Sequence, residues 1–411
     1  MLRSDLPRPD MSVPPPAAAD ATSIMVCLKG FGPGGVERIA LRLVEGWRGH
    51  GLAADLLVAD ADGPMRATGS ALAPAVAPAW PLIGRRAPLL RLLPFALREI
   101  RERRPAILFC PGNSYTALAV TLKLLLGRAC PTVVAKISND LERPDLHPAG
   151  RPFYRLWLRV QARAIDHVAA LSAPMAREAM RLMHMPAHRV HLVPNPVLAR
   201  ADLEGEPVRS RRREPGRRFV AVGRLERQKD YPLMLRAFAA ARQGDDRLVI
   251  YGEGRARHDL ERLAHGLGLA GQVVFAGYCA DVRARLAEYD ILLLTSAYEG
   301  QPGAVVEALS AGLGIVATRC CAGMAELLDD GALGMLVDRG DLEGMIRAIA
   351  TASPDMQDRP RARARARAFT IEAAVPAYAA LFARLSAERA RKTEGGSASP
   401  FPAKTARAGL R

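Results

Sequence analysis

The feature that most constrains the fold is a repeated alternation of short apolar runs with longer segments of helical spacing. Several runs are only four to eight residues long, which suits strands, whereas the segments between them have apolar residues at helical intervals. Such alternation is typical of βαβ units on a parallel sheet. In the first half, strands are expected at 24–28, 52–59, 107–110, 133–137, 168–171 and 190–193, and helices at 36–47, 89–101 and 117–126.

A second alternating series extends from residue 219 to about residue 350, so the chain divides into two α/β units. The segment 193–197 carries two prolines that interrupt regular structure, and a charged stretch follows it. We predict two Rossmann-like, doubly wound domains facing across a cleft. The boundaries are a disordered lead-in 1–22, an N-terminal domain 23–198, a linker 199–218, a C-terminal domain 219–368, a C-terminal helix 369–388 and a disordered tail 389–411.

The apolar runs, cysteines and histidines indicate in which compartment the protein works and whether it binds a metal. No run approaches the 18 apolar residues of a membrane span, and six scattered cysteines without a C-x-x-C pair indicate a reducing compartment. We therefore predict a cytoplasmic protein. His184, His188 and His191 are close in sequence, but Pro186 interrupts a common helix face and no carboxylate accompanies them, so we predict no metal site.

The positive charge is concentrated in the first half. Residues 24–198 contain 23 Lys and Arg against 12 Asp and Glu, a net of +11, whereas residues 216–370 contain 21 against 20, a net of +1. We predict peripheral contact between the first domain and an anionic membrane. No nucleic-acid motif accompanies the charge, and compositional bias is the remaining explanation. The basic clusters are 85–86, 98–104 and 151–163, the last with Phe153, Tyr154 and Trp157 as interfacial anchors.

Arginine and alanine alternate over 361–367, just before another segment of helical spacing. Residues two apart point in different directions on a helix, so the arginines form a collar and not a stripe. We favour a solvated helix start or linker, with membrane or polyanion contact as the alternative.

The loop Gly30–Gly35 matches G-x-G-x-x-G after a strand and before a helix, which is the dinucleotide-binding pattern. An NAD-dependent oxidoreductase is therefore one alternative function. This alternative leaves the charged motifs of the second half unexplained. The sequence also shows no evident pair of an acid and a base that would serve hydride transfer.

Those motifs begin with the apolar run 220–222, which ends at a glycine and is followed by Arg224 and Lys229. Arginine binds phosphate oxygens with a planar fork and lysine adds a compact positive charge, so the pair suits a diphosphate. Further along, Glu299 and Glu307 flank a Gly/Pro turn at a helix start, where free N–H groups favour anions or hydroxyl-rich ligands.

Between these two groups of motifs lie the segment 248–254, which contains Gly252, and the run 273–278. Taken in this order, the motifs resemble the nucleotide-binding half of retaining glycosyltransferases of family 4, which have the GT-B fold. Gly34 and Gly35 resemble the first-domain glycine loop of that family. The resemblance covers roughly residues 24–385 and implies that the C-terminal helix crosses back to the first domain. It implies a nucleotide-sugar donor, a glycan or lipid-linked acceptor, no cofactor and no metal, in surface polysaccharide or lipopolysaccharide synthesis.

The resemblance also implies residue roles. Arg224 and Lys229 would hold the diphosphate, Glu299 the donor sugar, and Glu307 the ribose. Asn139 and Asp140 stand where relatives carry a first-domain histidine, and Gln301 stands where they often carry an aromatic residue. A sugar-nucleotide epimerase and a non-catalytic binding protein remain alternatives. The remaining expected donor-binding positions, with backbone N–H groups at the helix start, are Gln301, Pro302, Gly303, Ala304 and Val305.

Overall fold

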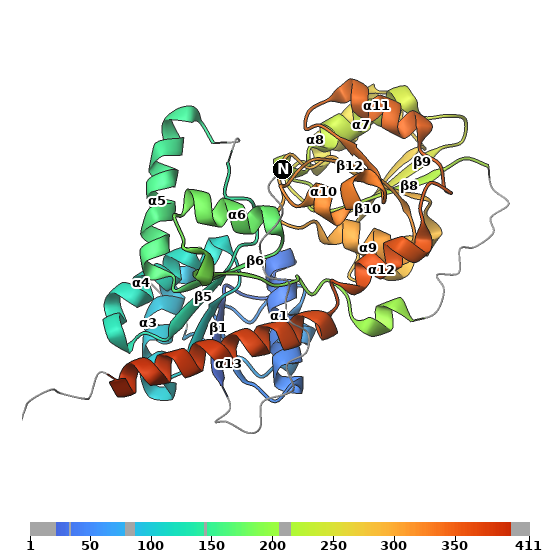
Figure 1. Cartoon of the computed structure of the whole chain (residues 1–411). Helices are drawn as coiled ribbons and strands as arrows, with labels where there is room; N and C mark the ends of the chain where they lie inside the picture. Colours follow the sequence, from blue (N-terminus) through green and yellow to red (C-terminus); the bar gives the residue numbers. More distant parts are fainter. Residues whose placement is uncertain (1–21, 33, 79–86, 144–145, 205–214, 396–411) are drawn as a thin grey trace, which may run out of the picture.

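The computed structural model describes residues 22–32, 34–78, 87–143, 146–204 and 215–395. They form two α/β domains, each built on a parallel sheet (Figure 1). The predicted fold class is confirmed. Because helices cover both sides of the sheets, central strands are buried on both faces, as are Ile107–Cys110, Thr132–Lys136, Ile291–Leu294 and Gly314–Thr318. The predicted lead-in up to residue 21 and the tail beyond residue 395 lie outside the described residues.

The first sheet has the order β3-β2-β1-β4-β5-β6-β7, with every pair parallel. The order reverses between β1 and β4, which creates a switch point at the carboxyl ends of the strands. Its strands are β1 (Ser23–Leu28), β2 (Ala53–Val58), β3 (Ala75–Val76), β4 (Ile107–Cys110), β5 (Thr132–Lys136), β6 (His167–Ala170) and β7 (Val190–Leu192). Its helices are α1 (Gly35–Gly49), α2 (Arg66–Ala71), α3 (Pro88–Arg103), α4 (Thr116–Leu126), α5 (Arg151–Ala164) and α6 (Ala173–Leu182).

The second sheet has the order β10-β9-β8-β11-β12-β13 and is also parallel, with its switch point between β8 and β11. Its strands are β8 (Arg218–Val222), β9 (Arg247–Tyr251), β10 (Val273–Gly277), β11 (Ile291–Leu294), β12 (Gly314–Thr318) and β13 (Met335–Val337). Its helices are α7 (Tyr231–Ala241), α8 (Arg257–Gly266), α9 (Gly303–Ala311), α10 (Met324–Leu327), α11 (Leu342–Thr351) and α12 (Arg359–Arg367).

The long helix α13 (Ile371–Gly395) runs across the base of the first domain (Figure 1). Its Tyr378 and Phe382 pack edge-to-face against Trp47 of α1, at ring-centre distances of 5.5 and 5.2 Å. Phe109 of β4 completes this buried cluster. The helix continues to Gly395, so the predicted start of a disordered tail at residue 389 is wrong.

Two segments connect the domains side by side. The N–H groups of Val197 and Ile371 donate to the carbonyls of Phe369 and Leu198, at 2.9 and 2.8 Å. Part of the predicted linker is ordered, because Arg200–Leu203 forms a turn of 3-10 helix whose Asp202 pairs with Arg283 at 3.0 Å. The linker residues 205–214 lie outside the described residues.

The Arg/Ala segment is packed and not merely solvated. In α12, Ala362 and Ala366 are fully buried, and the helix lies against α9. Arg361 pairs with Asp329, and Arg365 donates to the carbonyl of Glu326 at 2.8 Å. Several of these arginines therefore serve intramolecular contacts. The segment is a helix of the second domain, as one form of the favoured expectation had it, but it is packed and is not a solvated linker.

All six cysteines are free thiols, and five of them are buried. In the described part of the chain, no helix combines the length and apolar character needed to cross a bilayer. The same residues contain no group of three or more His, Cys, Asp or Glu side chains arranged to hold a metal ion.

Candidate functional site

A cavity of about 450 Å³ lies between the two domains. The second domain lines it with the carboxyl ends of β8 and β9 and with the segment that follows β10, where ligands of doubly wound sheets bind. The first domain contributes α1 and the segment that leads into α2. Charged residues of both signs line the cavity: Arg38, Arg42, Glu45, Arg224, Glu253, Asp281, Arg283 and Glu307.

Gly252 shapes the wall at the end of β9. A Cβ atom there would sit 1.9 Å from the carbonyl oxygen of Gly223, and the residue has φ of +151°. Glycine is therefore required for this close approach of two strand ends. The predicted donor-binding Gly252 lines the cavity together with Gly223 and Arg224.

Arg224 reaches the cavity directly after β8 and is exposed. Its guanidinium has no hydrogen-bond or ion-pair partner among the residues that the structure describes. Exposure keeps the charge hydrated, so an unpaired arginine is tolerated here, and its five N–H donors are available to an anionic ligand.

Lys229 is already paired. Its Nζ lies 2.5 Å from Oε1 of Glu299, and the two side chains are only 17% and 12% exposed. Ser296 also donates to the same carboxylate oxygen, at 2.8 Å. The methylenes of Lys229 pass close to Gly223, where an added Cβ would meet Cε at 2.8 Å. The ion pair therefore lies directly behind the cavity wall, next to Arg224.

Glu307 is enclosed by arginines. Burial raises the pKa of its carboxyl group above the usual value, and the positive charges of Arg38, Arg42 and Arg283 oppose only part of this rise. Arg38 Nη1 lies 4.0 Å from Glu307 Oε1. Because Arg38 and Arg42 belong to α1, the first domain supplies counter-charges to an acid on α9. The sequence alone did not connect Arg42 or Arg283 with this site.

The predicted helix start is present at α9. Pro302 occupies the N-cap and provides no side-chain cap, so among the described residues the N–H groups of Gly303 and Ala304 remain free for a ligand. Val305 is fully buried, and its N–H donates to the Pro302 carbonyl at 3.1 Å, so the structure offers neither its side chain nor its N–H group to a ligand. Gln301 Oε1 is buried and has no partner among the described residues. Gly303 and Ala304 form the first turn.

Gly34 is the N-cap residue of α1 and makes no side-chain capping hydrogen bond, and Gly35 is the first residue of the helix. Two residues later, Glu37 accepts a hydrogen bond from Tyr115 at 2.8 Å. The loop Gly30–Gly35, which matches the dinucleotide-binding pattern, contains the fully buried Phe31. The Phe31 carbonyl accepts a hydrogen bond from Met65 N–H at 3.1 Å. Pro33 lies outside the described residues.

Asn139 and Asp140 lie in a first-domain loop that contacts the second domain. Asp140 N–H donates to the Glu299 carbonyl at 3.3 Å, and its Oδ2 accepts from Ala322 N–H at 2.9 Å. Burial raises the pKa of the Asp140 carboxyl group to about 7. The Asn139 carbonyl accepts from the Asn113 side chain at 3.3 Å, which holds the loop to its own domain.

Lys136 is a further buried group that the sequence analysis did not single out. It ends β5, is 2% exposed, and its Nζ lies 3.3 Å from Oδ1 of Asn195. Burial lowers its pKa to about 7, and Glu37 and Cys110 partly oppose that effect. A lysine within an otherwise apolar strand was the available signal, because lysine is rarely buried without a partner.

Comparisons with known proteins agree with this geometry. Residues 33–198 match the family model described as Glycosyltransferase Family 4, and residues 216–355 match Glycosyl transferases group 1. The chain is 34% identical over 142 residues to the lipopolysaccharide core biosynthesis glycosyltransferase LpsE of Rhizobium meliloti, which covers 34% of this chain and 41% of LpsE. The chain thus spans about two fifths of that relative.

Solved structures resemble the whole described fold. Sucrose-phosphate synthase from Thermosynechococcus elongatus has a TM-score of 0.71 at 17% identity, over 89% of this chain and 100% of that one. The Anabaena protein HepE in complex with UDP has a TM-score of 0.67 at 18% identity, over 91% and 100%. At such identities the likeness concerns the fold alone. The family models favour a transferase over the oxidoreductase and epimerase alternatives.

Proposed function

Because the chain belongs to glycosyltransferase family 4 and has the GT-B fold, we propose that it is a retaining glycosyltransferase that uses a nucleoside-diphosphate sugar. The acceptor would be a hydroxyl of a glycan or glycolipid in lipopolysaccharide or polysaccharide synthesis. The observation that carries the proposal is the interdomain cavity at the carboxyl ends of the second sheet. It is lined by Glu307 and by Arg224, whose guanidinium has no partner among the described residues.

The donor would lie across the strand ends, with its diphosphate at Arg224 and at the free N–H groups of α9. Gly252 would act indirectly, because it lets the ends of β8 and β9 approach closely and so shapes the cavity wall. Glu307 would accept hydrogen bonds from the ribose hydroxyls once they displace part of its arginine environment. Since HepE was solved with UDP and with UDP-glucose, uridine diphosphate sugars are the first donors to test.

In the reaction, the acceptor oxygen forms a bond to the anomeric carbon while the bond from that carbon to the diphosphate oxygen breaks. The departing diphosphate takes the acceptor proton on the same face, which retains the configuration. Negative charge grows on the leaving group, and Arg224 would stabilise it together with Lys229 when the lysine shifts from Glu299 towards phosphate. Glu299 would then be free to accept from sugar hydroxyls. In this scheme, cationic side chains do the electrostatic work of a metal ion.

The test combines donor binding with turnover. Thermal shift and calorimetry with UDP-, GDP- and ADP-sugars should identify one nucleotide class that binds the wild type. Arg224→Ala and Glu307→Gln should weaken that binding, and Arg224→Ala should lower kcat/KM by about 100-fold, the usual effect of removing one charge-stabilising donor. Arg236→Ala is the matched control, because Arg236 is an exposed arginine on α7 outside the cavity.

Equal donor binding by wild type and both site variants would refute the assigned site. Donor binding without release of nucleoside diphosphate, with lipid-linked and soluble acceptors alike, would favour the non-catalytic binding protein instead.

A further inference from the structure

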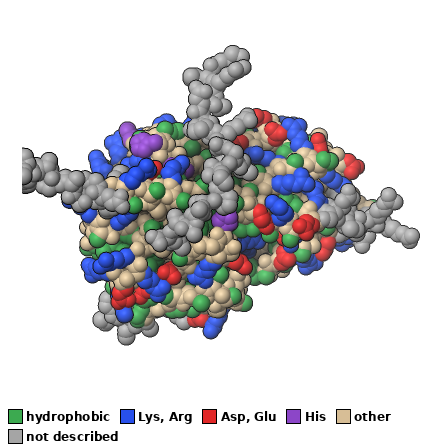
Figure 2. Space-filling view, turned by 60° about the horizontal axis from the view of Figure 1, so that its bottom comes forward, with side chains coloured by type: hydrophobic (Ala, Val, Ile, Leu, Met, Phe, Trp, Pro, Cys, Tyr) green, Lys and Arg blue, Asp and Glu red, His purple; other side chains and the backbone are tan. Residues whose placement is uncertain are grey.

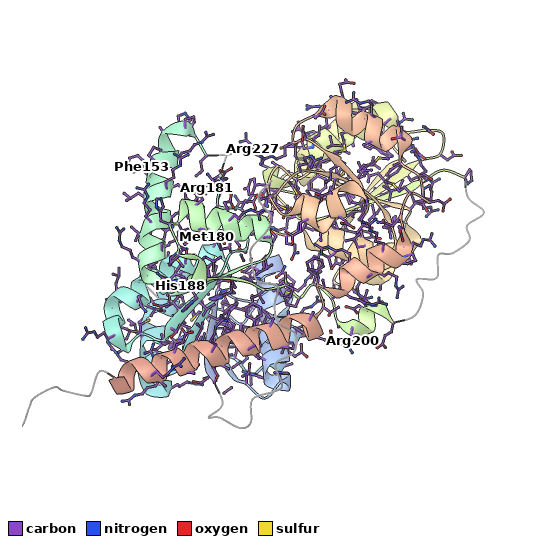
Figure 3. All side chains as sticks on the ribbon, viewed as in Figure 1. Phe153, Met180, Arg181, His188, Arg200 and Arg227 are labelled. Atoms are coloured by element: carbon purple, nitrogen blue, oxygen red, sulfur yellow. The ribbon has the colours of Figure 1, made fainter. Side chains whose placement is uncertain are left out.

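Helix α5 is amphipathic in an unusual way, because its outer face is both apolar and basic. It forms an outer edge of the first domain (Figure 1). Phe153 and Leu156 are 76% and 56% exposed, and Val160 is exposed as well. Their spacing of three and four residues places them along one side of the helix. Phe153 lies near the end of α5 away from the first sheet (Figure 3).

A row of arginines runs beside this apolar side. Arg155, Arg159 and Arg163 follow at intervals of four, all are exposed, and none has an acidic partner among the described residues. The sequence of α5 contains no acid. The opposite side, with Leu158 and Gln161, is buried against the domain. Exposed Leu124 and Leu125 on α4, which packs against α5, add to the apolar surface.

The other predicted basic clusters differ from this one. In 98–104, Arg98 pairs with Glu102, and Arg103 pairs with Glu99 and Asp55. Residues 85–86 lie outside the described residues. Figure 2 shows that Lys and Arg side chains are intermixed with Asp and Glu over much of one face. Arg101 and Arg104 of the cluster 98–104 are exposed and have no acidic partner among the described residues, so unpaired arginine alone does not distinguish α5. What distinguishes α5 is that its arginines lie beside exposed apolar side chains.

A second cavity, of about 200 Å³, lies at the start of α5. Arg143, Arg151 and Arg155 line it beside the apolar Leu158 and Leu182. The acid Glu142 lines it as well, but its carboxylate is paired with Arg181. Arg143 also lies over the ring of Tyr298, 5.1 Å from its centre. Because Tyr298 precedes Glu299, Arg143 contacts the segment that carries the ion pair between Glu299 and Lys229.

We propose that the outer face of α5 docks on an anionic membrane, with a lipid phosphate in the cavity lined by Arg143, Arg151 and Arg155. Phe153 and Leu156 enter the boundary between headgroups and acyl chains, and the arginine row contacts lipid phosphates. The exposed aliphatic side chains favour a bilayer over a nucleic acid. Docking in this way would hold the protein at a bilayer that can carry a lipid-linked acceptor. That last consequence rests on the proposed function, whereas the docking does not.

The experiment is vesicle co-sedimentation of the full chain. Vesicles of phosphatidylcholine alone are compared with vesicles containing about one third phosphatidylglycerol, because the attraction depends on anionic lipid. The wild type should sediment with the anionic vesicles only, and added salt should release it. Phe153→Ser/Leu156→Ser and Arg155→Ser/Arg159→Ser should each lower the partition coefficient about tenfold.

Matched controls come from the second domain. Val274→Ser removes a half-exposed apolar side chain on β10, and Arg236→Ser/Arg247→Ser removes two exposed arginines. Both should bind vesicles as the wild type does. The α5 variants should also keep their donor affinity and their transfer to a soluble acceptor, so a failure of docking is distinguishable from a failure of the proposed function.

Four outcomes would overturn the proposal. They are equal binding to neutral vesicles, unchanged binding of the α5 variants, equal losses in the controls, and no vesicle binding by the wild type. In the last case, light scattering that shows an α5-dependent dimer would assign the surface to a second copy. A gel shift of a nucleic acid that the α5 variants abolish would assign it to that partner.

Discussion

Gly300→Ala tests whether the contact between the two domains is needed for transfer. A Cβ atom at position 300 would lie 1.9 Å from the carbonyl oxygen of Ser138, and real Cβ atoms essentially never come within 3.0 Å. The first-domain loop would have to retreat by about 1 Å, which removes the bond from Asp140 N–H to the Glu299 carbonyl. A displacement of about 1 Å at a reacting site lowers rates by about 100-fold, or about 2.7 kcal/mol.

The assay is steady-state release of nucleoside diphosphate with a saturating donor, together with donor calorimetry. We expect kcat to fall by about 100-fold while the donor dissociation constant changes by less than about threefold, because the substitution leaves the strand ends that line the cavity in place. Gly266→Ala is the matched control, since no atom lies within 4 Å of a Cβ added at the end of α8. A kcat within about twofold of wild type in Gly300→Ala would refute the reasoning.

Two further predictions concern the first domain. Lys136 has its pKa lowered from 10.5 to about 7, so the unfolded state binds more protons between these values and the unfolding free energy rises with pH there, by up to about 1.4 kcal/mol per unit. In Lys136→Met, the unfolding free energy from urea titrations should rise less steeply between pH 7 and 9 than in the wild type. An unchanged slope would contradict the lowered pKa of Lys136. Phe382→Ala should lower the unfolding free energy by about 3 to 5 kcal/mol, because it leaves a cavity beside Trp47. Phe153→Ala, at an exposed phenylalanine, should change it by less than about 0.5 kcal/mol.

The sheets could be predicted from the sequence because buried parallel strands are locally recognisable. The expected strands at 24–28 and 107–110 match β1 and β4 to within one residue, since each is a short apolar run between helical segments. The packing of α12 could not be predicted in this way. Its arginines suggest solvent exposure, and only the neighbouring surface of α9 reveals that the alanines between them are buried.

By itself, the sequence determined the type and order of the elements, the two parallel sheets, the positions of Arg224 and Gly252 after strand ends, and that of Glu307 in the helix after the Gly/Pro turn. These depend on residues near one another in the chain. Only the tertiary structure decided the partners: Lys229 with Glu299, Arg38 with Glu307, and Ser138 against Gly300. These pairs are separated by 70, 269 and 162 positions of sequence, so their distances follow from how helices pack and how the two domains meet. No local pattern encodes such distances.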